Sequence, residues 1–399
     1  MEYQKQIQMR REKGKQIAQT GEVRLHGDTW LVPSQSSNRH YQVVLGLGSS
    51  KCTCLDFTEH GMKCKHIFSV EYTITKQKNP DGTTTITEIK KVTYSQEWAK
   101  YDAGQISEKE RFMELLNDLL KEVPESPNPI GRPQISNHDM FFACALKVYT
   151  QFSLRRFMSD LRIAKDKGCI QSTPSFASVG HFMQRQDIER VITQLIYMAS
   201  MPLRNVESQF AMDSSGFRTT RFTEYCKEKH KIIKYHRWLK AHIVVGVKTN
   251  VITSVEIDNE YSADCPKFIP LAQQTFVNGF KIKEMSADKA YLDNKNFDYA
   301  DNLDFTAFIP FREGSSSRGR DRSQIWRTMY HYFMYNRDEF MEHYHKRSNV
   351  ETTFFMIKSK FNDTLKGKTI QAQANELLFK LLCHNIVVIN NEINFMHLP

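Results

Sequence analysis

The sequence lacks any long hydrophobic run. No stretch of about 18 consecutive apolar residues occurs, so we expect no membrane-spanning helix. The first residues, MEYQKQIQMRREKGKQ, are charged and contain no apolar segment of the kind that a secretory signal needs. Eight cysteines in 399 residues do not indicate a disulfide scaffold, and we find neither internal repeats nor long low-complexity tracts. These absences predict a cytoplasmic globular protein in a reducing compartment, long enough for two or three domains.

Acidic residues are fewer than basic ones. The chain has 55 Lys and Arg against 45 Asp and Glu, a net charge of +10 and a pI near 9.0. A surplus of this size favours polyanionic partners, nucleic acid first, although a merely basic surface would give the same balance.

The pattern of residues divides the chain into three expected domains, 1–95, 96–206 and 207–395. Residues 1–20 read as a polar helix or tail, and residues 23–92 are strand-like, with a turn signal at 79–82 (NPDG). Residues 107–123 have helical spacing, prolines mark a linker at 124–133, and Ser136 with Asp139 predicts a capping box. The helices expected over 137–200 form either a helix-turn-helix that binds DNA or a plain helical bundle.

The third expected domain alternates between strands and helices. We expect strands at 207–212, 242–247, 251–257, 280–285 and 305–309, and helices at 338–361 and 371–393. This order predicts an α/β fold, a mixed sheet flanked by helices.

Metal-ligand residues gather in one short segment, 52–66, which reads CTCLDFTEHGMKCKH. Three thiolates and one imidazole suit tetrahedral zinc, and the close pairs at each end of the segment can converge on one ion. We therefore predict a structural zinc site, with His60 as a bystander; reduced thiols without metal are the alternative. The expected ligands are Cys52, Cys54, Cys64 and His66.

The spacing of this segment, together with Trp30 and Tyr41 in the strands before it, resembles the SWIM zinc finger. A closed site with four protein ligands leaves no open position for catalysis. The resemblance implies a small β-rich module that binds DNA or protein.

Three acids are candidate catalytic residues, although each could instead have an ordinary structural role. Asp213 could close a turn, Asp288 could cap a helix, and Glu351 could pair with Arg347 at i,i+4. Asp213 and Asp288, however, both stand where expected strands end, and ligands of α/β sheets collect at strand ends.

Glu351 lies on a helical stripe that carries chemistry. At about 100° per residue, Tyr344, Arg347, Glu351 and Lys358 fall within a sector of roughly 60° and span about 21 Å. A carboxylate flanked by cations suits metal-bound phosphodiester chemistry, since the acid can hold the metal while the cations hold the strand. An adjacent apolar face can pack on the sheet; it consists of Val350, Phe354, Ile357 and Phe361.

The three acids in this order, with the spacing Tyr-x-x-Arg-x-x-x-Glu and a later Lys, resemble the DDE transposases of prokaryotic insertion sequences. They resemble in particular the branch with a Tyr–Arg–Glu–Lys signature. The resemblance covers roughly residues 130–395. Its other elements are 131–133 (GRP), 213–217 (DSSGF), 237–242 (RWLKAH), 287–291 (ADKAY) and His384-Asn385. Two features depart from the family pattern: Asp213 is followed by Ser214 rather than by an acid, and the zinc module is not general to the family.

The resemblance implies a ribonuclease H-like fold and two magnesium or manganese ions. Asp213 would bridge the two ions, and Asp288 and Glu351 would each complete one site. Tyr344, Arg347 and Lys358 would contact the transferred strand. The resemblance also implies a nucleoid-associated protein that acts on double-stranded DNA, at element ends and target, as a homodimer.

Two basic segments could track the DNA backbone, although runs of charge are more often solvated faces. One contains Lys227, Lys229, Lys231, Lys234, Arg237 and Lys240; the other contains Arg312, Arg318, Arg320 and Arg322. Trp326 could stack on a displaced base or belong to the core.

Other functions are compatible with the same fold. The chain could be a domesticated regulator that binds DNA without catalysis, although all three acids are present. It could also be a nuclease that cuts without joining strands.

Overall fold

The computed structural model describes the chain except for a few segments. The chain forms two compact units, Met1–Gln96 and Glu97–Pro399. The segments outside this description are residues 1, 21–22, 27–28, 36–38, 45–49, 61, 79–83, 89–101, 103, 126–133, 220–237, 320 and 397–399. The second unit contains both the helical segment and the α/β segment that the sequence predicted as separate domains, and a boundary near residue 206 stays a prediction.

The first unit combines helices with a small antiparallel sheet. The sheet has the order β1-β2-β3-β4. Its strands are Arg24–His26, Thr29–Pro33, His40–Val44 and Lys51–Cys52. In β2 the side chains alternate, so that Trp30 and Val32 enter the core. A separate hairpin pairs β5, Ile74–Lys78, with β6, Thr84–Glu88, but the turn signal at 79–82 lies outside the described residues.

Helices occupy part of the region that the sequence predicted as strands. They are α2 (Leu55–His60) and α3 (Lys65–Thr73), whereas α1 (Glu2–Thr20) lies where the sequence predicted a polar helix or tail. The apolar residues Ile67, Phe68 and Val70 of α3 are buried, and α1 packs on α3 at Gly14. A Cβ added to Gly14 would lie 2.6 Å from Cβ of Phe68, so only glycine permits this approach. The helices displace the expected strands because α3 packs on both α1 and the sheet.

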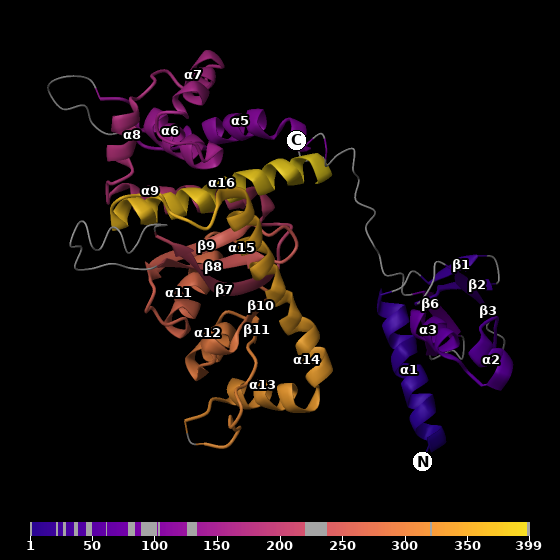
Figure 1. Ribbon diagram of the computed structural model, residues 1–399. Helices are drawn as coiled ribbons and strands as arrows, with labels where there is room; N and C mark the ends of the chain where they lie inside the picture. Colours follow the sequence, from indigo (N-terminus) through magenta and orange to yellow (C-terminus); the bar gives the residue numbers. More distant parts are fainter. Residues whose placement is uncertain are drawn as a thin grey trace, which may run out of the picture. The chain divides into compact units, whose positions relative to one another are not determined.

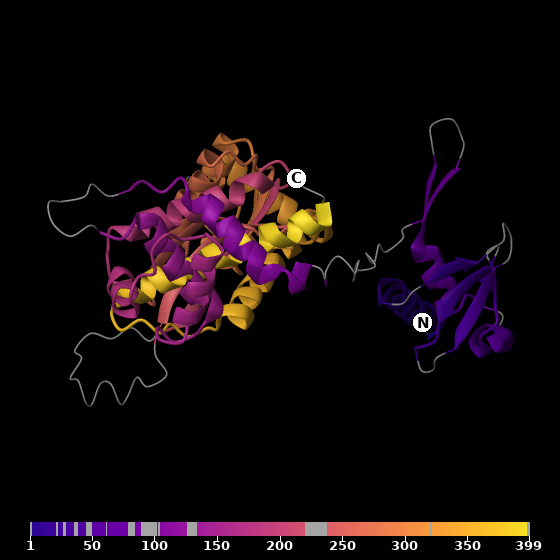
Figure 2. The same ribbon diagram turned by 90° about the horizontal axis from the view of Figure 1, so that it is seen from above.

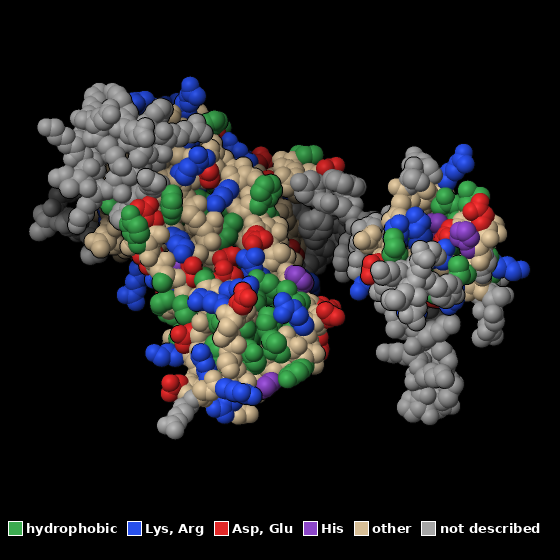
Figure 3. Space-filling model, turned by 60° about the horizontal axis from the view of Figure 1, so that its bottom comes forward, with side chains coloured by type: hydrophobic (Ala, Val, Ile, Leu, Met, Phe, Trp, Pro, Cys, Tyr) green, Lys and Arg blue, Asp and Glu red, His purple; other side chains and the backbone are tan. Residues whose placement is uncertain are grey.

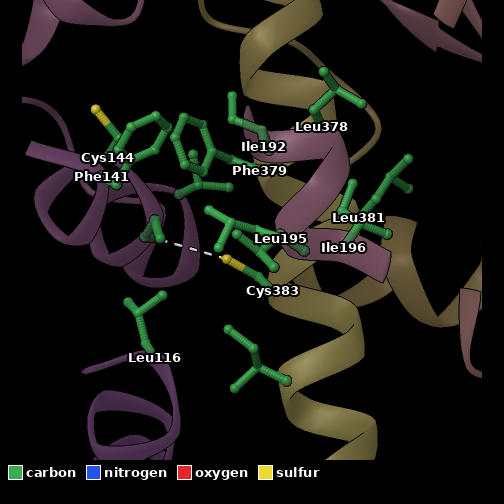
Figure 4. Close-up of a cluster of buried hydrophobic side chains, with 14 of the residues drawn as sticks. Leu116, Phe141, Cys144, Ile192, Leu195, Ile196, Leu378, Phe379, Leu381 and Cys383 are labelled. Atoms are coloured by element: carbon green, nitrogen blue, oxygen red, sulfur yellow. Dashed lines mark hydrogen bonds between the residues drawn. The ribbon is translucent and has the colours of Figure 1, made fainter. Parts of the chain in front are cut away.

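In the second unit, helices form a layer around one hydrophobic core (Figures 1 and 2). They are α5 (Glu108–Leu120), α6 (Asn137–Thr150), α7 (Met158–Asp166), α8 (Phe176–Phe182), α9 (Ile188–Ser200) and α16 (Ile370–Met396). The expected cap of α6 is present, since the Ser136 hydroxyl accepts from the Asp139 N–H at 3.1 Å. Figure 4 shows how α6, α9 and α16 interdigitate: Ile192, Leu195 and Ile196 of α9 face Leu378, Phe379 and Leu381 of α16.

The connection between α7 and α8 is residues 167–175, with Gly168 at φ 77°. This is longer than the turn of about three or four residues in a helix-turn-helix. Of the two arrangements considered from the sequence, the structure therefore matches the plain bundle.

The sheet of the second unit has five strands in the order β11-β10-β7-β8-β9. Their bounds are β7 Gln209–Arg218, β8 Trp238–Gly246, β9 Ile252–Asn259, β10 Glu284–Ala287 and β11 Thr306–Phe308. Strands β7, β8 and β9 form a meander in which β8 is antiparallel to both of its neighbours. In contrast, β10 is parallel to both β7 and β11.

Helices cover both faces of this sheet (Figure 1). On one face lie α9, α15 (Ser348–Phe361) and α16; on the other lie α11 (Phe268–Val277) and α12 (Asn294–Asn302). Between β11 and α15 the chain forms α13 (Gln324–Tyr335) and α14 (Arg337–Tyr344). Among the helices in the described part of the chain, none combines the length and hydrophobicity that crossing a bilayer requires.

The alternation along β7 decides which side chains meet α15. Ala211 and Phe217 belong to the core on the α15 side, whereas Phe210 and Met212 belong to the core on the α11 side. Since successive side chains of a strand point to opposite faces, Asp213 faces α15 and Ser214 faces away from it.

Two expectations about local structure were wrong. Strand β7 does not end at Asp213 but continues to Arg218, because β8 keeps pairing with it as far as Trp238; only the pairing with β10 stops at Met212. Residues 338–361 are not one helix, since a 3-10 turn, His345–Arg347, separates α14 from α15. Contacts of the turn with β10 hold it in place.

Candidate active site

Two of the three acids lie at neighbouring positions, Asp213 within β7 and Asp288 directly after the parallel strand β10. Ala287, the last residue of β10, pairs with Met212 of β7, so Asp288 and Asp213 are the residues that follow this pair. The Ser214 N–H donates to Oδ1 of Asp213 at 2.7 Å, and the Ala290 N–H donates to Oδ1 of Asp288 at 2.7 Å. Burial raises the pKa of Asp213, and the negative charge of Asp288 raises this pKa further.

An arginine, Arg347, bridges the third acid, Glu351, and the first, Asp213. Nη1 of Arg347 donates to Oδ2 of Asp213 at 2.6 Å, and Nη2 donates to Oε1 of Glu351 at 2.5 Å. The i,i+4 pair considered from the sequence therefore exists, but the same guanidinium also holds Asp213. Asp213 is 18% exposed and Glu351 is 57% exposed, so the group opens to solvent on the Glu351 side.

The carboxylates form a donor set that fits hard divalent cations. Their oxygens come from three elements, β7, the end of β10 and the first turn of α15, and magnesium and manganese prefer oxygen ligands. Arg347 already supplies positive charge between two of them.

The remaining two residues of the expected stripe have different surroundings. Nζ of Lys358 donates to the Ser215 hydroxyl at 2.7 Å and lies 5.1 Å from the centre of the Phe217 ring. Burial lowers the pKa of Lys358. Tyr344 is half-buried, with its ring 5.9 Å from Cζ of Arg347, and it lines a cavity of about 560 Å³ together with Lys289.

Glu284 holds the turn that carries Arg347, which the sequence did not predict. Glu284 is buried in β10; its carboxylate lies 2.6 Å from Nδ1 of His343 and accepts from Lys346. The His343 ring stacks on Phe308 with centroids 4.4 Å apart. No sequence signal singled out this anchor, because the expected strand 280–285 (FKIKEM) also carries Lys281 and Lys283.

In the first unit, the predicted zinc ligands form a buried cluster. One ligand atom of each of Cys52, Cys54, Cys64 and His66 lies within 4.8 Å of the others. Nδ1 of His66 is 3.8 Å from Sγ of Cys52 and 3.9 Å from Sγ of Cys64. A tetrahedron with metal–sulfur bonds of about 2.3 Å has edges of about 3.8 Å, so the cluster fits zinc. His60 is exposed and does not belong to the cluster.

Hydrogen bonding makes the thiols of this cluster unequal. The hydrogen bond between Cys52 and Cys64 lowers the pKa of Cys64 and raises that of Cys52. The His66 ring stacks on Tyr41 with centroids 4.3 Å apart, which fixes its orientation.

Two family models match the chain. Residues 204–386 match the transposase DDE domain, and residues 41–74 match the SWIM zinc finger. The chain carries a transposase DDE domain and a SWIM zinc finger. No curated protein and no solved structure matches it.

The transposase domain explains the sheet. A five-stranded mixed sheet flanked by helices, in the order β11-β10-β7-β8-β9, is the ribonuclease H-like fold that the sequence predicted. Asp213, Asp288 and Glu351 all lie within the residues that match the transposase domain, and the four clustered ligands lie within the SWIM match.

Several of the basic residues predicted to follow the DNA backbone form contacts within the protein. Nζ of Lys240 lies 2.7 Å from Oδ1 of Asp264 and donates to the Ser262 carbonyl at 3.1 Å. Arg312 donates to the Lys289 carbonyl, Arg322 stacks on Trp326, and Arg318 is exposed. Outside the described residues lie Arg237, the lysines at 227, 229, 231 and 234, Arg320 and residues 131–133.

Trp326 belongs to the core of the transposase domain. It is 2% exposed, packs among Phe297, Phe311 and Met329, and donates its indole N–H to the Ser316 carbonyl at 3.0 Å. Of the two roles considered from the sequence, base stacking is therefore wrong, because the ring has no accessible face.

Proposed function

We propose that this protein is an active transposase that cleaves DNA at the ends of its element and joins the 3′ ends to target DNA. The observation that carries the proposal is the convergence of Asp213, Asp288 and Glu351 within a transposase DDE domain, with Arg347 bridging two of them. The catalytic ligands of two magnesium or manganese ions would be these three acids, with Asp213 shared. Such ions activate the attacking water or 3′-hydroxyl and stabilise the leaving oxygen.

The chain's own groups would position the DNA strand. Arg347 contacts Asp213 and Glu351, and Lys358 donates to Ser215, two residues after Asp213; together with Tyr344 beside Arg347, these groups would contact the strand near the cleaved end. On the face seen in Figure 3, Lys and Arg side chains are interspersed with acidic ones, so the net charge does not form one uniform patch there. Lys240 is not included among the DNA contacts, because it is directed to Asp264.

We further propose that the SWIM finger binds one structural zinc ion through Cys52, Cys54, Cys64 and His66, and that it contributes to DNA binding. Joining requires two element ends in one complex, so we expect a homodimer on DNA.

The test uses the full-length protein and DNA that carries the inverted repeats flanking its gene. With magnesium or manganese, we expect cleaved ends and joined products, and both are lost in Asp213→Asn. Asp338→Asn removes an exposed acid of α14 and serves as the matched control, so it should leave both products unchanged.

Two results would overturn the proposal. Cleavage without joined products would identify a nuclease, and DNA binding without any metal-dependent reaction would identify a regulator.

A further inference from the structure

The residue after the first acid is a serine, and its side chain has a role that the proposed catalysis does not use. Since side chains alternate along β7, the Ser214 hydroxyl points to the sheet face opposite Asp213. There it donates to Oδ1 of Asp264 at 2.8 Å. Asp264 follows β9, a strand that does not touch β7, so this hydrogen bond reaches across the sheet.

Asp264 is the centre of a small polar cluster on the sheet face opposite Asp213. The same Oδ1 lies 2.7 Å from Nζ of Lys240 and 3.3 Å from Nδ1 of His242. His242 is fully buried and stands opposite Ser214 in the β7–β8 register. Burial opposes a charge here, but the nearby His242 and Lys240 and the hydrogen bond from Ser214 outweigh it and hold the pKa of Asp264 below its ordinary range.

The cluster reaches the candidate metal ligands through one residue. The hydroxyl of Ser214 is fixed by Asp264, and its N–H donates to Oδ1 of Asp213 at 2.7 Å. We propose that Asp264, with Lys240 and His242, is a positioning residue: it fixes Ser214, which orients the Asp213 carboxylate for the divalent ion. This inference rests on the proposed function. Hydrogen bonds behind a ligand commonly change metal affinity by about 10- to 100-fold.

A second acid with a serine and a lysine as partners provides a control. Asp258 of β9 accepts from the Ser262 hydroxyl at 2.8 Å and lies 2.7 Å from Nζ of Lys267. It therefore also pairs with one serine and one lysine, but its serine does not adjoin any of the three acids.

The experiment measures manganese binding to the full chain without DNA, from the electron paramagnetic resonance signal of the free ion. We expect Asp264→Asn to weaken manganese binding by about 10-fold, and Asp258→Asn to change it by less than about 2-fold. Because Asp264→Asn also removes a negative charge, Ser214→Ala is the decisive variant: it keeps every charge and should weaken binding to a similar extent. Ser214→Thr restores the hydroxyl and should recover most of the affinity.

The outcomes separate this inference from the proposed function. If Ser214→Ala binds manganese as the parent does, or if the two aspartate variants behave alike, the positioning role is overturned while the three acids stand. If the parent shows no manganese binding that Asp213→Asn abolishes, the proposed function itself fails. Far-UV circular dichroism identifies a variant that does not fold; should Asp264→Asn be one, the two Ser214 variants decide alone.

Discussion

At the level of single residues, the candidate site is an arrangement of like charges held together by one cation. Asp213 has two negative neighbours, Asp288 and Asp264, whose charges both raise its pKa. Arg347 is the group that offsets them, since it lowers the pKa of Asp213 and also pairs with Glu351. A divalent ion bound to the same acids would take over part of this role.

The first prediction concerns Arg347→Ala. Without metal, removal of the guanidinium leaves the acids uncompensated, so the Tm should fall by about 2–4 °C. Added manganese should then raise the Tm of the variant more than that of the parent, because the ion restores the missing positive charge. Differential scanning calorimetry with and without manganese measures both effects.

Arg185→Ala is the matched control, since Arg185 pairs with Asp187 on the surface. Its Tm should change by about 1 °C or less. Equal manganese-induced shifts in the parent and in Arg347→Ala would contradict the compensating role of Arg347.

At the level of elements, α16 joins the helical layer to the sheet through polar side chains. The Asn385 side chain accepts from the Ile252 N–H at 2.9 Å and donates to the carbonyls of Ile252 and Ile196, in β9 and α9. Nε2 of the adjacent His384 lies 2.9 Å from the Asn250 carbonyl, and burial lowers the pKa of His384 to about 4.

A pH dependence of stability follows from His384. Its pKa in the unfolded chain is about 6.5, so protons bind preferentially to the unfolded state between about pH 6.5 and about pH 4. The free energy of unfolding therefore decreases as the pH falls through this window. His384 contributes up to about 3 kcal/mol to this decrease. His384→Gln, which cannot take up a proton, should flatten the dependence in urea titrations.

His331→Gln replaces an exposed histidine of α13 and should leave the pH dependence as it is in the parent. An unchanged slope in His384→Gln would contradict the assignment.

The elements also differ in how well they could be predicted from the sequence. The mixed sheet followed from strand and helix patterns. The catalytic role of the three acids stays a prediction from their motifs, and the expected position at a strand end is confirmed for Asp288 but not for Asp213, since β7 continues to Arg218. Asp264 could not be predicted, because a single acid in a connection has no periodicity, and its partners lie on β7 and β8, far from it in sequence. The 3-10 turn before α15 escaped prediction for a similar reason, since Glu284 and Phe308, which hold it, are distant in sequence.

At the level of the whole molecule, the two units have separate cores of very different size. The core of the first unit is small and includes the thiols of Cys52, Cys54 and Cys64, so its apolar burial is limited. The core of the second unit contains large aromatic side chains on both faces of the sheet. Metal binding should therefore matter far more to the stability of the first unit than to that of the second.

Zinc removal should accordingly unfold one unit and spare the other. We expect about one zinc ion per chain, lost in Cys52→Ser but retained in Cys265→Ser, which replaces a thiol of the second unit. On chelation, amide hydrogen exchange should accelerate in α1 and α3 and stay slow in α16. Metal content near zero in the parent, or exchange that accelerates in both units together, would contradict this prediction.

The position of α16 in the fold has a consequence for the timing of activity during synthesis. This helix is the last element of the fold, yet it lies at the centre of the core and clamps both β9 and α9. Asp213 and Glu351 are both translated before α16, whose apolar side chains share one core with those of β7 and α15. A nascent chain whose α16 is still inside the ribosome would therefore carry all three acids while the sheet lacks part of its covering layer, so we expect the acids to assemble only after α16 has packed.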